Sequence, residues 1–433
     1  MPSALSKCRM LALTGVVLSS IILLSIPAPE LFAQQLNLVP PREPVPAAYF
    51  GLHIHHMWSD PVHHQWNEAE WPTIPFGTWR LWDAHVLWTY LEPAPNQYNF
   101  TILDHYLQDT QSRNVQTVLT LEGTPTWASA RPQEVPMHQG GEKGATGSAA
   151  EPANLADWEN FVRTVATRYK GKIHFYEIWN EPMFKPYYSG SVPSMVALVR
   201  SASTVLKEVD PSNRVLQPPV DGNSDGLSWL NSFLAAGGGK FVDIYSFHLY
   251  PGGDGSPEVN IAKTGNIRRV LRSYGEDAKP LWITEEGWEF PKYSPQVGAG
   301  YVARALLLGW PLGYGRVFIY SWDHNVFGLA PDGQAGRPMS QAYETTEHWL
   351  VGSTMTRCIE EGNGLWVENL TLPNGHQGKV LWSSDGEISV SKDHLAGATG
   401  YATIDGRTFS LNPNVHLTVG GSPILLFYGG ETF

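Results

Sequence analysis

The chain has 433 residues, of which 42% are hydrophobic, and its formal net charge at pH 7 is −12. This length allows a large core and favours one large domain followed by a small one. The acidic charge, without any cluster of Lys or Arg, argues against nucleic acid and anionic membrane surfaces as partners.

Residues 1–33 have the pattern of an N-terminal export signal. Two basic residues precede an apolar run from Met10 to Ile26, and Ala33 is a candidate cleavage site. The run is close to the shortest length that spans a bilayer, so an uncleaved membrane anchor over residues 10–26 is the alternative. We therefore expect residues 34–433 to act as a secreted or periplasmic protein, attached to a membrane only if this anchor is retained.

Cysteine usage excludes two further classes of protein. The only cysteines are Cys8, inside the predicted signal, and Cys358. The mature chain therefore has neither a disulfide framework nor a cysteine metal site.

A repeating pattern of strands and helices begins after a proline-rich lead-in from Leu36 to Ala48, which predicts irregular structure. Helical stretches begin at capping residues such as Asn99, Asn154 and Ser294. Eight strands alternating with helices predict a (β/α)8 TIM barrel over residues 34–350. The predicted strands are the short apolar runs at 48–56, 77–83, 115–121, 173–179, 215–218, 242–250, 281–288 and 316–321.

The pattern changes near residue 351. From there, short strands alternate with hairpin turn signals, which predict a small antiparallel, sandwich-like β domain over residues 351–433. The turn signals are Pro373-Asn374-Gly375, Asp385-Gly386, Asp405-Gly406 and Gly420-Gly421.

Two glutamates stand at the carboxyl ends of predicted strands, where a (β/α)8 barrel places its chemistry. Glu181 follows the strand at 173–179, and Glu285 lies in the strand at 281–288. Glycoside hydrolysis requires such a pair, with one carboxyl neutral to protonate the leaving oxygen and the other charged. The chain also has an unusually high content of 17 Trp, 18 Tyr and 16 Phe. Core packing accounts for most of this excess, and the remainder suits a sugar site, because aromatic rings stack on the C–H faces of sugars.

These motifs carry a family resemblance. Trp179-Asn180-Glu181-Pro182 on strand four and Ile283-Thr284-Glu285-Glu286-Gly287 on strand seven resemble the acid/base and nucleophile motifs of clan A glycoside hydrolases. The form beginning at Glu177 is most similar to family 39, including its bacterial exopolysaccharide-cleaving members. The resemblance spans residues 48–350, and it implies a retaining enzyme with Glu181 as acid/base and Glu285 as nucleophile. Met183 follows the proline where family 39 often has Asn, which leaves the leaving-group side open.

The resemblance also implies several substrate contacts. Asn180 would contact the sugar 2-hydroxyl, while Arg80 and Tyr250 would keep Glu285 ionised. Trp322 would form an aromatic platform. The alternatives are a buried ion pair unconnected with catalysis for Arg80, and core packing for Trp322.

Glu286 competes with Glu285 for the nucleophile role. Adjacent residues of a strand point to opposite faces, so only one of the two faces the barrel axis. The family pattern Thr-Glu-x-Gly selects Glu285 and leaves Glu286 to an outer salt bridge.

The histidines support a second hypothesis. Four residues resemble the set of metal ligands in amidohydrolase barrels. They are His53 and His55 after strand one, His248 after strand six and Asp323 after strand eight. Strand five at 215–218 supplies no histidine, however, and Glu285 would then have no task. We therefore predict no metal and no cofactor, and we assign His53, His55, His248 and Trp127 to sugar contacts. A carbohydrate-binding protein without catalysis is a third alternative, which the presence of both glutamates disfavours.

We expect an oligosaccharide or polysaccharide substrate with β linkages, and endo action on it. Aromatic residues follow several strands and could stack a chain of sugars across the barrel face. If half of them pack the loops instead, a pocket for one sugar remains. The sequence leaves the sugar, the linkage and the oligomeric state open. The aromatic residues in question are Trp58, Trp82, Trp88, Trp127, Phe184, Tyr187, Tyr250, Trp288 and Trp322.

Overall fold

The computed structural model describes residues 36–58, 70–135, 145–289, 292–330, 337–412 and 416–429. The predicted export signal therefore lies outside the described residues. Residues Gln35–Phe433 form one compact unit. No helix in the described ranges is both long and apolar enough to cross a membrane.

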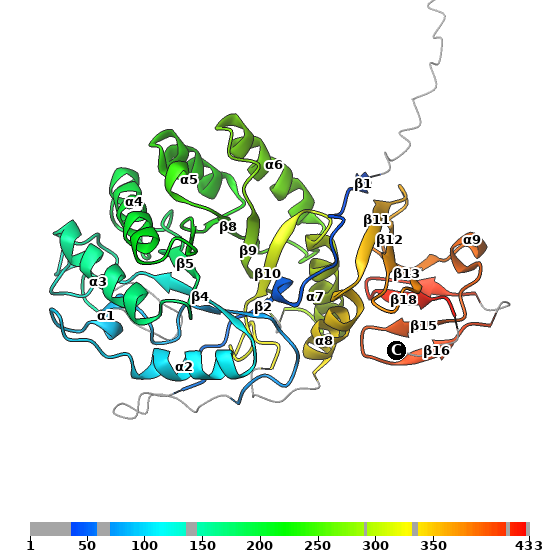
Figure 1. The fold of residues 1–433 in the computed structure, drawn as a ribbon. Helices are drawn as coiled ribbons and strands as arrows, with labels where there is room; N and C mark the ends of the chain where they lie inside the picture. The colour runs from blue at the N-terminus through cyan, green and yellow to red at the C-terminus, as the bar shows by residue number, and fades with distance from the viewer. Residues whose placement is uncertain are drawn as a thin grey trace, which may run out of the picture. The chain divides into compact units, whose positions relative to one another are not determined.

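A curled sheet of nine parallel strands forms the centre of the fold, in the order β6-β5-β4-β3-β2-β10-β9-β8-β7 (Figure 1). Its two edges meet where the Val215 carbonyl accepts hydrogen bonds from the backbone N–H groups of Asp243 and Ile244. All eight predicted barrel strands are confirmed, and β7 continues the fifth strand after an interruption at Pro218. The bounds are β2 Phe50–Leu52, β3 Thr78–Leu81, β4 Gln116–Leu121, β5 Phe175–Ile178, β6 Arg214–Leu216, β7 Val220–Asp221, β8 Tyr245–His248, β9 Leu281–Glu286 and β10 Tyr314–Ile319.

Helices connect these strands and surround the sheet (Figure 1). Two predicted caps are confirmed, since the Asn154 side chain accepts from the Ala156 N–H and Ser294 accepts from the Val297 N–H. The predicted cap Asn99 is wrong, because α2 has Phe100 at its N-cap position and no side-chain cap. Ser191 forms a capping box at the start of α4. Helix α5 lacks a side-chain cap and was not predicted. The bounds are α1 Trp88–Leu91, α2 Thr101–Ser112, α3 Leu155–Arg168, α4 Val192–Val209, α5 Ser224–Ala235, α6 Val259–Ser273, α7 Pro295–Gly309 and α8 Pro338–Leu350.

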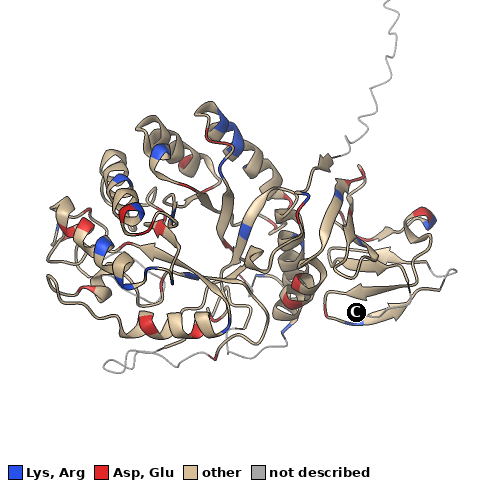
Figure 2. Cartoon of the chain, viewed as in Figure 1, with Lys and Arg blue, Asp and Glu red and all other residues tan. Residues whose placement is uncertain are grey.

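Charged residues are spread along these helices. Figure 2 shows acidic and basic positions mixed over the described helices and strands, with no long basic run. This distribution agrees with the absence of a basic cluster in the sequence.

A second sheet of seven antiparallel strands follows the barrel, in the order β1-β11-β12-β13-β18-β15-β16. Its edge strand β1 comes from the lead-in that was predicted to be irregular. That prediction was wrong for Leu36–Leu38, because these residues pair with the free edge of β11 from Cys358 to Glu360. The remaining bounds are β11 Thr354–Glu360, β12 Leu365–Thr371, β13 Gln377–Ser383, β15 Gly400–Thr403, β16 Thr408–Ser410 and β18 Ile424–Phe427, with the separate pair β14 Ile388–Ser389 and β17 Thr418–Val419 and the short helix α9 Lys392–Leu395.

The second sheet contacts the barrel through α6 and α7. The Trp382 indole N–H donates to Glu258, at the start of α6, over 2.9 Å. A Cβ at Gly300 in α7 would lie 2.5 Å from the carbonyl oxygen of Gly421, so only glycine allows this approach. The predicted domain boundary near residue 350 falls between the end of α8 and the start of β11.

Candidate active site

The loop after β5 carries Glu181 in a strained backbone conformation. Trp179 has φ 67° and Glu181 has φ 42°, both in the left-handed region that non-glycine residues seldom adopt. Such conformations cost about 1–3 kcal/mol each and cluster at functional sites. The chain therefore departs from strand geometry as soon as β5 ends, and the Glu181 side chain lines a cavity.

Glu285, by contrast, lies within strand β9 and is surrounded by donors. Arg80 Nη1 donates to Glu285 Oε1 over 2.7 Å, and the Tyr250 hydroxyl donates to Oε2 over 2.7 Å. The Nδ1 atom of His248 lies 3.4 Å from the same Oε2. These contacts stabilise the charged form of the carboxylate.

Arg80 on β3 connects both strands of the site. Its guanidinium is fully buried and donates to Glu177 Oε2 over 2.6 Å and to Asn180 Oδ1 over 2.8 Å, besides its bond to Glu285. Burial opposes the charge, but Glu177 and Glu285 raise the pKa of Arg80 above its ordinary value. Arg80 therefore contacts Glu285 directly, and whether this ion pair takes part in catalysis is a matter for the proposed function. Sequence reasoning missed Glu177, whose only signal was an acid inside an otherwise apolar strand.

His248 lies between the two glutamates. Its Nδ1 is 2.8 Å from Glu181 Oε1. Burial raises the pKa of Glu181 to about 7 and lowers the pKa of His248 to about 4. A neutral imidazole accepts a hydrogen bond from a protonated Glu181 or donates one to the ionised form, depending on its tautomer.

The two glutamates and His248 are tightly grouped. One oxygen of each carboxylate and one ring nitrogen of His248 all lie within 4.8 Å of one another. Within the described ranges no other group of His, Cys, Asp and Glu has the spacing of metal ligands.

The remaining histidines of the amidohydrolase hypothesis are bound elsewhere. His53 Nε2 lies 2.8 Å from the Thr284 carbonyl oxygen, and His55 Nδ1 lies 2.9 Å from Asp323 Oδ1. The structure therefore gives that hypothesis no ligand set built from His53, His55 and Asp323.

A cavity of about 230 Å³ opens in front of Glu181 and Glu285. Tyr320, which directly follows β10, reaches this cavity, whereas Trp322 is 1% exposed and packs in the core. The residue predicted as the aromatic platform, Trp322, therefore does not line this cavity, whereas Tyr320, two residues earlier, does. Besides the two glutamates, the lining residues are Trp82, Tyr187, Tyr250, Tyr320, His324 and Phe327.

The predicted contact residues thus fall into two sets. Arg80, Asn180, His248 and Tyr250 gather around the two carboxylates. Asn180 Nδ2 is buried and has no hydrogen-bond partner among the described residues. His53, His55, Trp127 and Trp322 do not line the cavity, and the Trp127 indole N–H donates to the Glu92 carbonyl oxygen.

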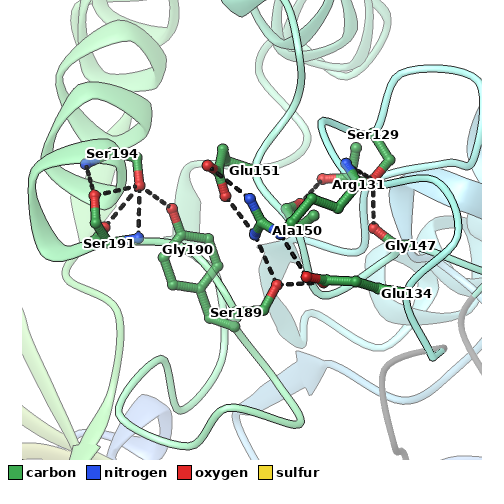
Figure 3. A network of polar contacts seen from close by, with 12 residues as sticks. Ser129, Arg131, Glu134, Gly147, Ala150, Glu151, Ser189, Gly190, Ser191 and Ser194 are labelled. Atoms are coloured by element: carbon green, nitrogen blue, oxygen red, sulfur yellow. Dashed lines mark hydrogen bonds and ion pairs between the residues drawn. The ribbon is translucent and has the colours of Figure 1, made fainter.

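An ion-pair network fastens the loop that carries Glu181 (Figure 3). Arg131, in the loop after β4, makes a bidentate pair with Glu151 at 3.0 and 2.8 Å and a bond of 2.5 Å to Glu134. Its Nη2 also donates over 2.7 Å to the hydroxyl of Ser189, which follows Tyr187 in the loop after β5. The network therefore ties the segment that bears Glu181 and Tyr187 to the neighbouring loop.

Comparison with known proteins agrees with the chemistry that this geometry allows. Residues 124–300 match the family model described as glycosyl hydrolase catalytic core. The chain carries this core and is a glycoside hydrolase. The matched part of the glycoside hydrolase contains Glu181, His248, Tyr250 and Glu285, while Arg80 and Tyr320 lie outside it. No curated protein matches the sequence.

Solved structures share the fold. A family 39 glycoside hydrolase from the gut symbiont Bacteroides cellulosilyticus WH2 aligns with TM-score 0.69 and 16% identity, over 89% of this chain and 81% of that one. A monomeric β-xylosidase from Caulobacter crescentus CB15 aligns with TM-score 0.63 and 14% identity, over 90% and 97%. CelM2, a bifunctional glucanase-xylanase from a metagenome library, aligns with TM-score 0.57 and 12% identity, over 90% and 98%. At these identities the likeness establishes the (β/α)8 barrel followed by an antiparallel sheet.

Proposed function

We propose that this glycoside hydrolase cleaves β-linked polysaccharide with retention of configuration, using Glu181 as acid/base and Glu285 as nucleophile. The observation that carries the proposal is the spacing of the two carboxylates. One carboxylate oxygen of Glu181 lies within 4.8 Å of one carboxylate oxygen of Glu285. Retaining enzymes hold their carboxyl groups about 5–5.5 Å apart, whereas inverting enzymes leave about 6.5–9.5 Å for a water molecule.

The first chemical step forms a covalent intermediate. A Glu285 carboxylate oxygen attacks the anomeric carbon as the glycosidic C–O bond breaks, and Glu181 gives its proton to the departing oxygen. In the second step Glu181, now ionised, takes a proton from water while the water oxygen displaces Glu285. The glutamates return to their starting states, and the sugar leaves with its original configuration.

The surrounding residues support these two roles. Arg80 and Tyr250 stabilise the charge on Glu285 before attack and when it leaves the sugar. The Nδ2 group of Asn180 suits the sugar 2-hydroxyl, whose hydrogen bonds strengthen in the transition state. Burial raises the pKa of Glu181 to about 7, so about half of the molecules hold a protonated Glu181 at neutral pH, and a general acid requires this form.

The substrate we propose is a β-linked polysaccharide cleaved within the chain. The open cavity and the exposed Phe184, 39% accessible on the loop of Glu181, support a chain that passes across the barrel face. Trp88 and Trp322, by contrast, are at most 1% exposed and offer no stacking surface. Neighbouring structures described as a β-xylosidase and a glucanase-xylanase favour xylose or glucose units.

The retention claim is tested by proton NMR of the first sugar released. We expect the β-anomer to appear first and then to mutarotate, and initial release of the α-anomer would contradict the mechanism. On a long polymer, a rapid fall in viscosity with few reducing ends supports endo action, and steady release of monosaccharide refutes it. Activity abolished by a chelator and restored by zinc would favour the metal-dependent alternative.

We also propose that the enzyme acts outside the cytoplasm, on the evidence of the export pattern in residues 1–33. Intact precursor found soluble in the cytoplasm of the native cell would contradict this location.

A further inference from the structure

A second cavity of about 320 Å³ adjoins the catalytic one. The two cavities share Tyr250 and Phe327 in their linings, so these two rings form the wall between them. Neither Glu181 nor Tyr187 lines the second cavity, which is formed by the segments that follow β8, β9 and β10. It therefore extends the site along the barrel face on the side of Glu285.

The walls of this second cavity are held by specific contacts. The Trp288 indole N–H donates to the Gly255 carbonyl oxygen over 2.7 Å, which joins the segments after β9 and β8. Gly255 has φ 87°, and a Cβ there would lie 2.7 Å from Tyr293 Cζ. Tyr293 also packs edge-on against Tyr301 of α7, with ring centroids 5.3 Å apart. The aromatic surface is therefore fixed before a ligand arrives, which reduces the entropy lost on binding.

Lys292 adds a polar group at the same cavity. Its Nζ donates to the Gly253 carbonyl oxygen over 3.0 Å and lies 5.3 Å from the centre of the Tyr293 ring. An ammonium has three donors, so others remain for a ligand hydroxyl. Glu289 lines the cavity as well and offers acceptors. Aromatic surface with a few hydrogen-bonding groups at one edge matches the flat C–H face and equatorial hydroxyls of a pyranose ring.

We propose that this second cavity is a sugar subsite, which binds the ring next to the one held between Glu181 and Glu285. The inference rests on the proposed function and deepens it, because it requires substrates with at least two neighbouring sugar rings for full activity. Because Tyr250 and Phe327 line both cavities, two sugar rings bound in these cavities would occupy adjacent positions along one sugar chain.

The test compares substrates that fill one cavity or both. The one-ring substrates are β-D-xylosyl fluoride and β-D-glucosyl fluoride, whose fluoride leaving group occupies no second subsite, and the longer ones are xylotriose and cellotriose. We expect Tyr293→Ala to lower kcat/KM for the trisaccharide about 3- to 10-fold more than for the matching fluoride. The loss should appear mainly in KM. Tyr274→Ala is the matched control, since Tyr274 is 38% exposed at the end of α6 and lines neither cavity.

A second variant keeps the test possible if Tyr293→Ala does not fold. Lys292→Met keeps the length of the side chain and removes the ammonium, and we expect the same selective loss without a change in the thermal midpoint. Equal losses on fluoride and trisaccharide, or no loss on either, would overturn the subsite.

A binding measurement separates the subsite from the proposed reaction. In the Glu181→Gln background, calorimetry should show tighter binding of the trisaccharide than of the monosaccharide, and Tyr293→Ala should remove most of the difference. Equal affinities for the two sugars would overturn the subsite even if hydrolysis is retained. If the parent enzyme cleaves neither fluoride nor trisaccharide but this difference in affinity persists, the proposed reaction fails and the subsite stands.

Discussion

The ends of β5 and β9 offer the same residue type in two opposite environments. At β9, Glu285 accepts from Arg80 and from the Tyr250 hydroxyl, each over 2.7 Å. Beyond β5, the carboxyl group of Glu181 has a hydrogen-bond contact only to His248 within the described part of the chain, and burial raises its pKa to about 7. The number of donors, rather than depth of burial alone, separates the two carboxyl groups.

In the mechanism that we propose, this difference allows one barrel mouth to supply both an acid and a nucleophile. Desolvation favours the neutral form of any carboxyl group, and a fixed cation reverses that preference. Arg80 is directed at Glu285 and not at Glu181, while His248, with a pKa lowered to about 4, adds no positive charge at neutral pH. The following predictions test this difference between the two carboxyl groups.

The largest effect should follow loss of the nucleophile. Glu285→Gln keeps the shape of the side chain but removes the charge that attacks the anomeric carbon, so we expect kcat to fall by about 10⁴-fold or more. Steady-state kinetics on an aryl β-glycoside would measure it.

Its control is the adjacent residue. Glu286 is 2% exposed, Asn260 Nδ2 donates to it over 2.8 Å, and burial raises its pKa to about 8. Burial therefore favours the protonated form of Glu286 at pH 7, and Glu286→Gln should lower kcat by less than about 10-fold. Comparable losses in the two variants would remove the reason for choosing Glu285.

Loss of the acid should depend on the leaving group. We expect Glu181→Gln to slow hydrolysis of an unactivated oligosaccharide by about 10²- to 10⁴-fold, the usual contribution of general acid–base catalysis. A glycosyl fluoride needs little protonation, so its first step should be nearly unaffected, and added azide should restore turnover by replacing water. An equal defect on both substrates would argue that Glu181 holds the structure rather than transfers a proton.

The pH profile should report the same carboxyl group. A general acid must be protonated in the free enzyme, so kcat/KM should fall about tenfold per unit above the Glu181 pKa of about 7. With an activated substrate, Glu181→Gln should lose this alkaline limb. A wild-type limb near pH 4.5, the ordinary range for a glutamate, would contradict the raised pKa.

The smallest effect concerns the fastening of the Glu181 loop. Arg131→Ala removes the bonds to Glu151 and Ser189, so the loop after β5 should become less ordered and kcat/KM should fall up to about 10-fold. Arg131→Lys, which keeps the charge but not the bidentate geometry, should fall in between. An unchanged kcat/KM in Arg131→Ala would show that the network does not position the site.

The contrast also explains how much could be predicted. The eight strands followed from short apolar runs and from turn and cap residues, because those signals are local. The roles of Glu181 and Glu285 came from their places at strand ends and from the motif resemblance. Glu177 and Tyr320 were missed because their roles depend on contacts with Arg80 and with the cavity, which no local pattern records. Strand β1 was missed for the same reason, since its partner β11 lies more than 300 residues away.

Covalent trapping tests the central claim most directly. A 2-deoxy-2-fluoro glycosyl fluoride of the sugar that the enzyme cleaves should stop at the glycosyl-enzyme, because the 2-fluorine slows breakdown of the intermediate. Peptide mapping by mass spectrometry should then find the fluorosugar on Glu285, with Glu181 and Glu286 unmodified. A label on Glu181 or Glu286, or turnover of the fluorosugar with inversion and no label, would contradict the account.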